Sequence, residues 1–327
     1  MASSRWLLIL KACLIRGLGK LLLPLINFLT RKASYPSTFS RKIPTTISPL
    51  RGNILLEFYT PQDYYQTRNK TSFPAIINFH GGGFCLGSAI DDAPWAKVLV
   101  EECNAVIISV NYRLAPEYPF PTAVEDGADA LLYVVAHADE LGIDIDRIAT
   151  SGFSAGGNLC ITVPLLFQEI LQKRGQEPVD LKAIAAWYPS TDFTRSRADR
   201  VATMVRPDKQ LPRFLTRLFD EGYVHPADVD RSGPYLSPFV TSKDILARLP
   251  KNFILYTCEW DMLEKEGTEF ARRLEEEIGK HVKVKMVKGV PHGWDKYPNA
   301  SPAPESFYSE ACVYLNRAFE GGDVSGQ

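Results

Sequence analysis

The sequence lacks the features that mark several classes of protein. Its 327 residues contain six scattered cysteines and no Cys-x-x-Cys pair, so we expect reduced core cysteines in an intracellular, cytoplasmic protein rather than a disulfide framework or a metal site. The formal net charge is −1 and no block of Lys or Arg stands out, which argues against a nucleic-acid partner. No internal repeat or low-complexity tract is visible.

A long uncharged apolar run is also missing. Lys11, Arg16 and Lys20 interrupt the apolar residues of 4–30 every few positions, which predicts a basic amphipathic helix rather than a membrane span. Two interpretations of residues 5–29 stay open. The helix either forms half of a cap packed on the rest of the protein, or it makes peripheral contact with a membrane surface.

Short β-favouring runs alternate with stretches of helical spacing along most of the chain. The predicted strands are 53–59, 73–79, 105–110, 147–150, 183–187, 253–258 and 282–287. The predicted helices are 93–103, 123–141, 263–279 and 306–319, with a further helix directly after Ser154. This alternation predicts an α/β fold with a mostly parallel central sheet and helices on both faces. Residues 190–234 break the pattern and predict a helical insertion over one end of the sheet.

The pattern Gly152-Phe153-Ser154-Ala155-Gly156 follows the predicted strand 147–150. Small residues around Ser154 allow a tight strand-to-helix turn that lifts the serine hydroxyl out of the sheet. The helix that begins there aims unpaired N–H groups at the same point, which suits an oxyanion. The pattern predicts a catalytic nucleophile, and an ordinary glycine-rich turn is the alternative.

A nucleophilic serine needs a base, for which histidine is the usual residue, and the chain has five histidines. In a parallel sheet, active groups collect beyond the carboxyl ends of the strands. His292 stands just past the predicted strand 282–287 and meets this condition. We therefore predict His292 as the base, against the alternative of a hydrogen-bonded loop histidine.

The same rule selects the acid that orients the base. The predicted strand 253–258 ends at Glu259 and Asp261, and Asp261 has the shorter, less mobile carboxylate. Asp261 is the preferred acid, with Glu259 and Asp192 as competitors, and a helix cap or surface ion pairs as the structural alternatives. With Asp261 the order of the residues is serine, acid, histidine, which is the order seen in hydrolases built on this kind of sheet.

Three consecutive glycines, residues 81–83, follow His80 at the end of the predicted strand 73–79. Such a run permits close approach of the backbone and turns N–H groups towards a ligand, as an oxyanion hole requires. A flexible glycine turn is the alternative.

Together these residues resemble the hormone-sensitive-lipase-like carboxylesterase family of α/β-hydrolases. The matching segments are 80–83 (HGGG), 111–121 (NYRLAPEYPFP), 152–157 (GFSAGG), Asp261 and 292–293. The resemblance implies an α/β-hydrolase fold with a helical cap, and an oxyanion hole formed by Gly82, Gly83 and Ala155. It gives His80 the structural role of holding the glycine loop. The chain departs from the family at Phe153, where Asp, Glu or Thr is usual, and in the residues that follow Asp261.

The chain is expected to divide into several parts. The resemblance assigns residues 1–50 to N-terminal cap helices and 190–234 to a cap insertion. Residues 51–189 and 235–320 then form the core, and 321–327 are expected to be a disordered tail. The candidate substrate-pocket residues are Phe84, Phe153, Leu215 and Trp294.

The function expected from these features is hydrolysis of a small to medium hydrophobic carboxylic ester through an acyl-enzyme intermediate. The partner is a small-molecule ester, no metal or organic cofactor is suggested, and the sequence does not indicate an oligomeric state. One alternative is an acyltransferase or non-hydrolytic enzyme that uses the same site. Another is a non-catalytic receptor on the same fold. Plant gibberellin receptors resemble this family but lose the catalytic histidine, whereas His292 is present here.

Overall fold

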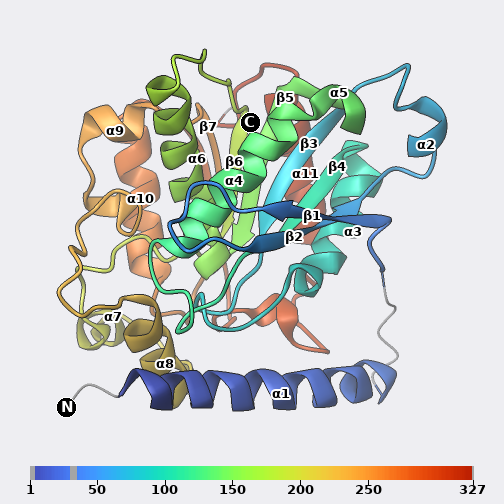
Figure 1. The fold of residues 1–327 in the computed structure, drawn as a ribbon. Helices are drawn as coiled ribbons and strands as arrows, with labels where there is room; N and C mark the ends of the chain where they lie inside the picture. Colours follow the sequence, from blue (N-terminus) through green and yellow to red (C-terminus); the bar gives the residue numbers. More distant parts are fainter. Residues whose placement is uncertain (1–3, 30–34, 326–327) are drawn as a thin grey trace.

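An eight-stranded sheet runs through the part of the chain that this computed structural model describes, residues 4–29 and 35–325 (Figure 1). The strands are β1 Phe39–Pro44, β2 Asn53–Tyr59, β3 Phe73–Phe79, β4 Val106–Asn111, β5 Ile143–Phe153, β6 Ala183–Trp187, β7 Asn252–Cys258 and β8 His281–Val287. Their order in the sheet is β1-β2-β4-β3-β5-β6-β7-β8. β2 is antiparallel to β1 and β4, and all later pairs are parallel, so the predicted mostly parallel sheet is confirmed.

Helices cover both faces of this sheet (Figure 1). The longer ones are α1 Arg5–Leu29, α3 Ala93–Cys103, α4 Thr122–Ala136, α6 Ala155–Lys173, α8 Arg213–Tyr223, α10 Glu264–Glu276 and α11 Glu305–Phe319. The shorter ones are α2 Tyr64–Thr67, α5 Ala138–Leu141, α7 Arg197–Ala202, α9 Lys243–Ala247, and the 3-10 turns η1 Ala89–Asp92, η2 Pro207–Lys209, η3 Pro238–Val240 and η4 Trp294–Lys296. The single helix predicted over 123–141 is divided at His137 into α4 and α5.

Alternation along the strands builds two separate cores, because successive side chains in a strand point to opposite faces. Ile76 of β3 pairs with Ile107 of β4, and both pack with the side chains of α3 and α11. Their neighbours Ile77 and Ile108 pack on the other face with α4 and α6. All four side chains are fully buried. The central strands therefore appear as continuous apolar runs in the sequence.

Two expectations from the sequence need correction. The segment assigned to N-terminal cap helices contains β1, an edge strand whose residues are mostly exposed and partly charged, so it carries no strand signal. The tail was expected to be disordered from residue 321. Residues 321–325 are instead placed against the sheet, where Val324 is fully buried and its N–H donates to Asn252 Oδ1 at 3.3 Å. Residues 326–327 lie outside the described residues.

The segment 190–234 contains the two helices α7 and α8. α1 packs on α8 and runs along one side of the molecule, at the bottom of Figure 1. The N-terminal helix and the two helices of a distant segment thus form one layer at an end of the sheet (Figure 1).

Candidate active site

Ser154 occupies the turn between β5 and α6. Its φ of 54° and ψ of −112° are unusual for a residue with a side chain, and such a conformation costs on the order of 1–3 kcal/mol. The turn is tight because α6 approaches β3 closely: a Cβ on Gly156 would lie 1.9 Å from the carbonyl oxygen of Phe79. The N–H of Ser154 donates to Trp187 O at 2.8 Å, which fixes the turn to β6. The fold therefore holds this hydroxyl in one place at the edge of the sheet.

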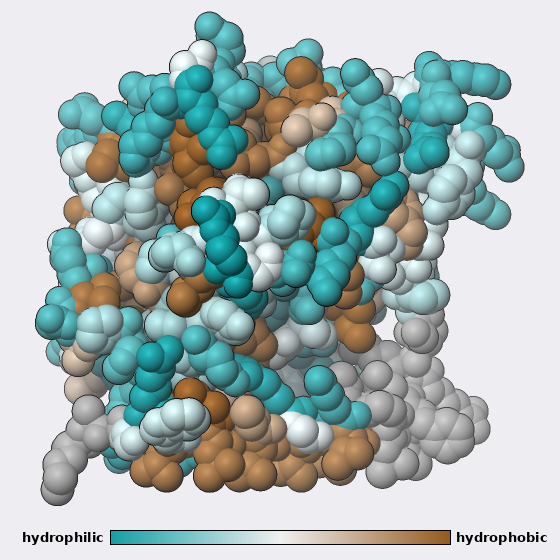
Figure 2. Space-filling view, viewed as in Figure 1, coloured by the Kyte–Doolittle hydropathy of each residue, from teal (hydrophilic) through white to brown (hydrophobic). Residues whose placement is uncertain are grey.

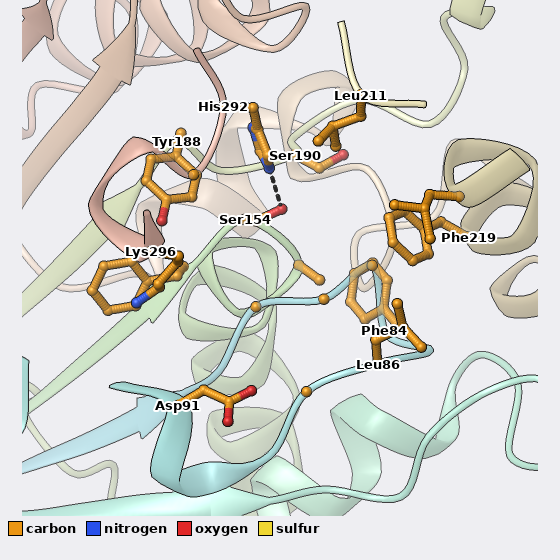
Figure 3. Close-up of a pocket in the computed structure, with 18 of the residues that line it drawn as sticks. Phe84, Leu86, Asp91, Ser154, Tyr188, Ser190, Leu211, Phe219, His292 and Lys296 are labelled. Atoms are coloured by element: carbon orange, nitrogen blue, oxygen red, sulfur yellow. Dashed lines mark hydrogen bonds between the residues drawn. The ribbon is translucent and has the colours of Figure 1, made fainter. Parts of the chain in front are cut away.

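A chain of two hydrogen bonds connects Ser154 to an imidazole and a carboxylate. The Ser154 hydroxyl donates to His292 Nε2 at 2.8 Å, as Figure 3 shows, and His292 Nδ1 donates to Asp261 Oδ2 at 2.6 Å. Asp261 follows β7 and His292 follows β8, so neighbouring parallel strands deliver the two groups to one edge. The Asp261 side chain is 1% exposed. Since a carboxylate only accepts, the imidazole proton lies on Nδ1 and leaves Nε2 free to take a proton.

The two competing carboxylates point elsewhere. Glu259 accepts from the N–H of Gly289 at 2.7 Å, and this bond lowers the pKa of its carboxyl group. Asp192 forms an ion pair with Arg195 at 2.9 Å. The structure thus brings only Asp261, of the three candidates, to His292.

The glycine loop lies beside Ser154. Gly82 has a φ of 117°, and a Cβ there would lie 2.3 Å from the carbonyl oxygen of Leu86, so no other residue fits. His80 is fully buried, and its ring stacks on that of Tyr112 with 4.2 Å between centroids. The Tyr112 hydroxyl donates to His80 O at 2.8 Å, and burial lowers the pKa of His80. A neutral, packed imidazole holds this end of the loop in place.

Three backbone N–H groups around Ser154 have no acceptor among the described residues. They belong to Gly82, Gly83 and Ala155. Ala155 is the first residue of α6, where helix N–H groups lack an intrahelical partner and the helix dipole is positive. The arrangement can bind a small anion or a polarised carbonyl oxygen.

A cavity of about 840 Å³ opens over Ser154 and has two unlike sides. Figure 3 shows apolar side chains on one side of the serine: Phe84, Leu86, Leu211 and Phe219. On the other side it shows Tyr188, Lys296 and Asp91. α8 contributes Leu215 and Phe219 to the apolar side.

Three of the four pocket residues predicted from the sequence line this cavity. Phe84 and Leu215 lie on its apolar side, while Phe153 is fully buried below it, stacked on Trp187 with 5.5 Å between centroids. The prediction for Trp294 is wrong. Its side chain is 1% exposed, its indole N–H donates to Pro302 O at 3.2 Å, and it is no part of the cavity wall. The position directly after the His-Gly pair falls in η4, which turns this side chain into the core.

Sequence patterns carried no signal for the charged group on the polar side of the cavity. Lys296 binds Asp92 at 2.7 Å and Asp295 at 3.0 Å, with its Nζ 3.6 Å from the centre of the Phe153 ring. Burial lowers the pKa of Lys296, but the carboxylates of Asp295 and Asp92 raise it more, so it stays a cation.

Tyr188 is the other residue that sequence reasoning missed. Its ring meets the His292 imidazole edge-on at 4.8 Å between centroids, and its hydroxyl donates to Asp295 Oδ1 at 2.5 Å. The contact fixes the position of the imidazole. Within the part of the chain that the structure describes, no group of His, Cys, Asp and Glu side chains is arranged to hold a metal ion.

Comparison with known proteins places this geometry in a family. A family model described as alpha/beta hydrolase fold matches residues 76–296. An arylesterase of Saccharolobus solfataricus is 34% identical over 68% of this chain and 69% of its own length. The carboxylesterase NlhH of Mycobacterium tuberculosis is 29% identical over 78% and 77% of the two chains. The solved structure of an esterase from Pyrobaculum calidifontis superposes with a TM-score of 0.75 over 93% of both chains at 29% identity.

The fold, the matched span and these relatives agree. The chain belongs to the hormone-sensitive-lipase-like family of α/β-hydrolases and is a serine hydrolase of the carboxylesterase type.

Proposed function

We propose that this enzyme hydrolyses small to medium hydrophobic carboxylic esters, with Ser154 as nucleophile, His292 as base and Asp261 as the group that orients the base. The observation that carries the proposal is the unbroken pair of hydrogen bonds, 2.8 Å from Ser154 Oγ to His292 Nε2 and 2.6 Å from His292 Nδ1 to Asp261 Oδ2. The relatives named arylesterase and carboxylesterase support the same substrate class.

In the acylation step, Ser154 Oγ attacks the ester carbonyl while its proton passes to His292 Nε2. The imidazolium that forms is stabilised by the buried carboxylate of Asp261. As the tetrahedral intermediate collapses, Nε2 gives the proton to the departing alkoxide, and an alcohol leaves. Water then repeats the sequence on the acyl-enzyme, with His292 again taking the proton, and the carboxylic acid is released.

The oxyanion of the two tetrahedral intermediates is the group that we assign to the N–H donors of Gly82, Gly83 and Ala155. They have no acceptor among the described residues, so binding the oxyanion breaks no existing hydrogen bond. Each such donor contributes about 3 kcal/mol to lowering the barrier.

The two sides of the cavity suggest how an ester lies in it. We assign the acyl chain to the apolar side, which Phe84, Leu215 and Phe219 line, and the alcohol to the side of Lys296. A cavity of about 840 Å³ has room for a short to medium acyl chain and its alcohol. We further propose that α1, α7 and α8 act as the cap over the acyl side, on a core that contains the whole sheet from β1 to β8.

The test is a series of p-nitrophenyl esters from acetate to palmitate, with wild type and Ser154→Ala. We expect kcat of Ser154→Ala to fall by roughly 10⁵-fold or more, because the serine and its base act as a unit. Ser306→Ala on α11 is the matched control, and its kcat should equal that of wild type. A fluorophosphonate should label wild type at Ser154, as peptide mass spectrometry would show. Near-normal turnover in Ser154→Ala would refute the proposed mechanism.

Product analysis in mixtures of water and a competing alcohol separates hydrolysis from acyl transfer. The proposal expects free acid as the main product at low alcohol concentration. Faster turnover on emulsified long-chain triglyceride than on soluble short esters would contradict the assignment of the acyl side.

A further inference from the structure

The N-terminal helix α1 is held to the body of the enzyme along one face. Leu8 and Ala12 are 3% and 0% exposed and belong to the main core. Arg16 Nε donates to Cys85 O at 2.8 Å, its Nη2 to Ala115 O at 2.6 Å, and its Nη1 to Glu117 Oε1 at 2.8 Å. These bonds fix how α1 is rotated about its own axis. The face it turns away from the body is therefore a fixed feature of the surface.

That outer face is apolar. The exposed side chains are Trp6 (78%), Leu7 (53%), Leu10 (55%), Leu14 (59%), Leu18 (57%) and Leu21 (75%). At about 100° per residue, Leu10, Leu14 and Leu21 fall within roughly 40° of one another around the helix. Figure 2 shows the result as a continuous hydrophobic band along the lower edge of the molecule, over α1. We call Trp6, Leu7, Leu10, Leu14, Leu18 and Leu21 the outer apolar face.

Basic residues border this face. The 25 residues of α1 include four basic residues and no acidic one. Lys11 and Lys20 are exposed and form no ion pair within residues 4–29 and 35–325. They lie about 80° and 100° to either side of the line through Leu10, Leu14 and Leu21. Their long apolar stems can follow that face while the ammonium groups reach past it.

Two occupants could cover the outer apolar face, and charge separates them. A second copy docked through the same face would bring Lys11 and Lys20 of both helices together, with no acidic residue on α1 to pair with them. A bilayer that contains anionic lipids presents apolar chains to the leucines and negative headgroups to the lysines. An exposed tryptophan at one end of such a helix also suits the headgroup region.

We propose that α1 docks this enzyme on the surface of an anionic lipid bilayer, with the outer apolar face in the acyl–headgroup boundary and Lys11 and Lys20 among the headgroups. The helix lies flat and does not span. Over the described residues, no helix has the length and apolar character that a crossing would require. The cap and membrane interpretations of the sequence are then compatible, because opposite faces of one helix serve them.

Flotation of the full-length enzyme with vesicles tests the proposal. We expect binding to vesicles of phosphatidylcholine mixed with phosphatidylserine, and weaker binding to phosphatidylcholine alone. Leu10→Glu with Leu14→Glu should abolish binding. Val313→Glu on α11, at a residue that is 58% exposed, is the control for a charge on another surface and should bind as wild type does.

The charge contribution is tested separately. Lys11→Glu with Lys20→Glu should weaken binding to the anionic vesicles by more than tenfold, since each lysine near such a surface contributes roughly fivefold. Lys70→Glu, at an exposed lysine that closely follows α2, is the matched control, since α2 lies far from α1 in Figure 1. Vesicles with brominated acyl chains should quench the fluorescence of wild type and leave that of bound Trp6→Phe largely unchanged, because the other tryptophans are more buried.

None of these α1 side chains lines the cavity, so turnover of a soluble short ester should be the same in every variant. Loss of vesicle binding with unchanged turnover and melting temperature supports the proposal. It is overturned if wild type does not float with anionic vesicles, or if the double leucine variant floats equally well. A wild-type dimer that Leu10→Glu with Leu14→Glu makes monomeric, without vesicle binding in either, would assign the face to a second copy.

Discussion

Replacing Asp261 by Asn tests the proposed site at the position for which the sequence left the most candidates. Asp261 uses both carboxylate oxygens: Oδ2 accepts from His292 Nδ1 at 2.6 Å and Oδ1 from the N–H of Leu263 at 3.1 Å. The Leu263 N–H requires an acceptor, so in Asp261→Asn the carbonyl oxygen of the new side chain takes the Oδ1 position. Its amide group then faces His292 and donates to Nδ1.

This hydrogen bond changes the tautomer of His292, and the change explains the expected loss of activity. An imidazole that accepts at Nδ1 carries its proton on Nε2, and this hydrogen then points at Ser154 Oγ, 2.8 Å away. In this form the ring cannot take the serine proton, and the imidazolium loses its buried counter-charge. We expect kcat to fall by about 10³- to 10⁴-fold, or roughly 4–5.5 kcal/mol of transition-state stabilisation, with KM little changed. The loss should be smaller than that of Ser154→Ala.

The assay is kcat on a saturating p-nitrophenyl ester at neutral pH, with the rate of fluorophosphonate labelling as a second measure of serine reactivity. Glu259→Gln is the matched control, because Glu259 directly follows the same strand but its carboxylate accepts from Gly289 and not from His292. Its kcat should stay within about twofold of wild type. A kcat within about tenfold of wild type in Asp261→Asn, or an equal loss in Glu259→Gln, would refute the assignment.

Further predictions concern packing, the cavity and the response to pH. Gly156→Ala should lower the free energy of unfolding by roughly 2–4 kcal/mol, measured in urea, because its Cβ would lie 1.9 Å from Phe79 O. A change below about 0.5 kcal/mol would contradict this packing. Leu215→Trp on the apolar side should lower kcat/KM for octanoate esters by about tenfold relative to acetate, and an unchanged ratio would argue against this acyl side. Burial raises the pKa of Cys85 and Cys160 above the ordinary value of 9.0, so the unfolded chain loses these protons first. The stability that each thiol contributes is fully present below about pH 9 and falls above it, by up to about 1.4 kcal/mol per pH unit for each group. Unfolding titrations at pH 8 and pH 10 would show the drop, and Cys85→Ala should reduce its slope.

Much of the fold could be inferred from the sequence because the signals are local. The apolar runs, the glycines that end them and the helical spacing between them predicted the parallel strands and most helices. The Gly-x-Ser-x-Gly pattern pointed to Ser154, and the rule that active groups collect at the carboxyl ends of such strands then selected His292 without any contact information. The edge strand β1 was not predicted, because exposed, partly charged residues at a sheet edge show no alternating pattern. The burial of Val324 was not predicted, because it depends on a surface that distant strands and α11 create.

The choice between the candidate carboxylates depends on tertiary contacts rather than on local sequence patterns. Glu259 and Asp261 are two residues apart at the end of β7, and the sequence treats them almost alike. The turn after the strand sends one to the backbone of Gly289 and the other to His292, which depends on the packing of β7 against β8. The ion pair of Lys296 with Asp92 and the hydrogen bond of Arg16 that fixes the rotation of α1 likewise join segments far apart in the chain. Local patterns of residues thus specify which elements form and which residue types meet at the edge of the sheet. The side chains that touch are specified by the packed molecule, because a contact of a few ångströms depends on the relative placement of whole strands and helices.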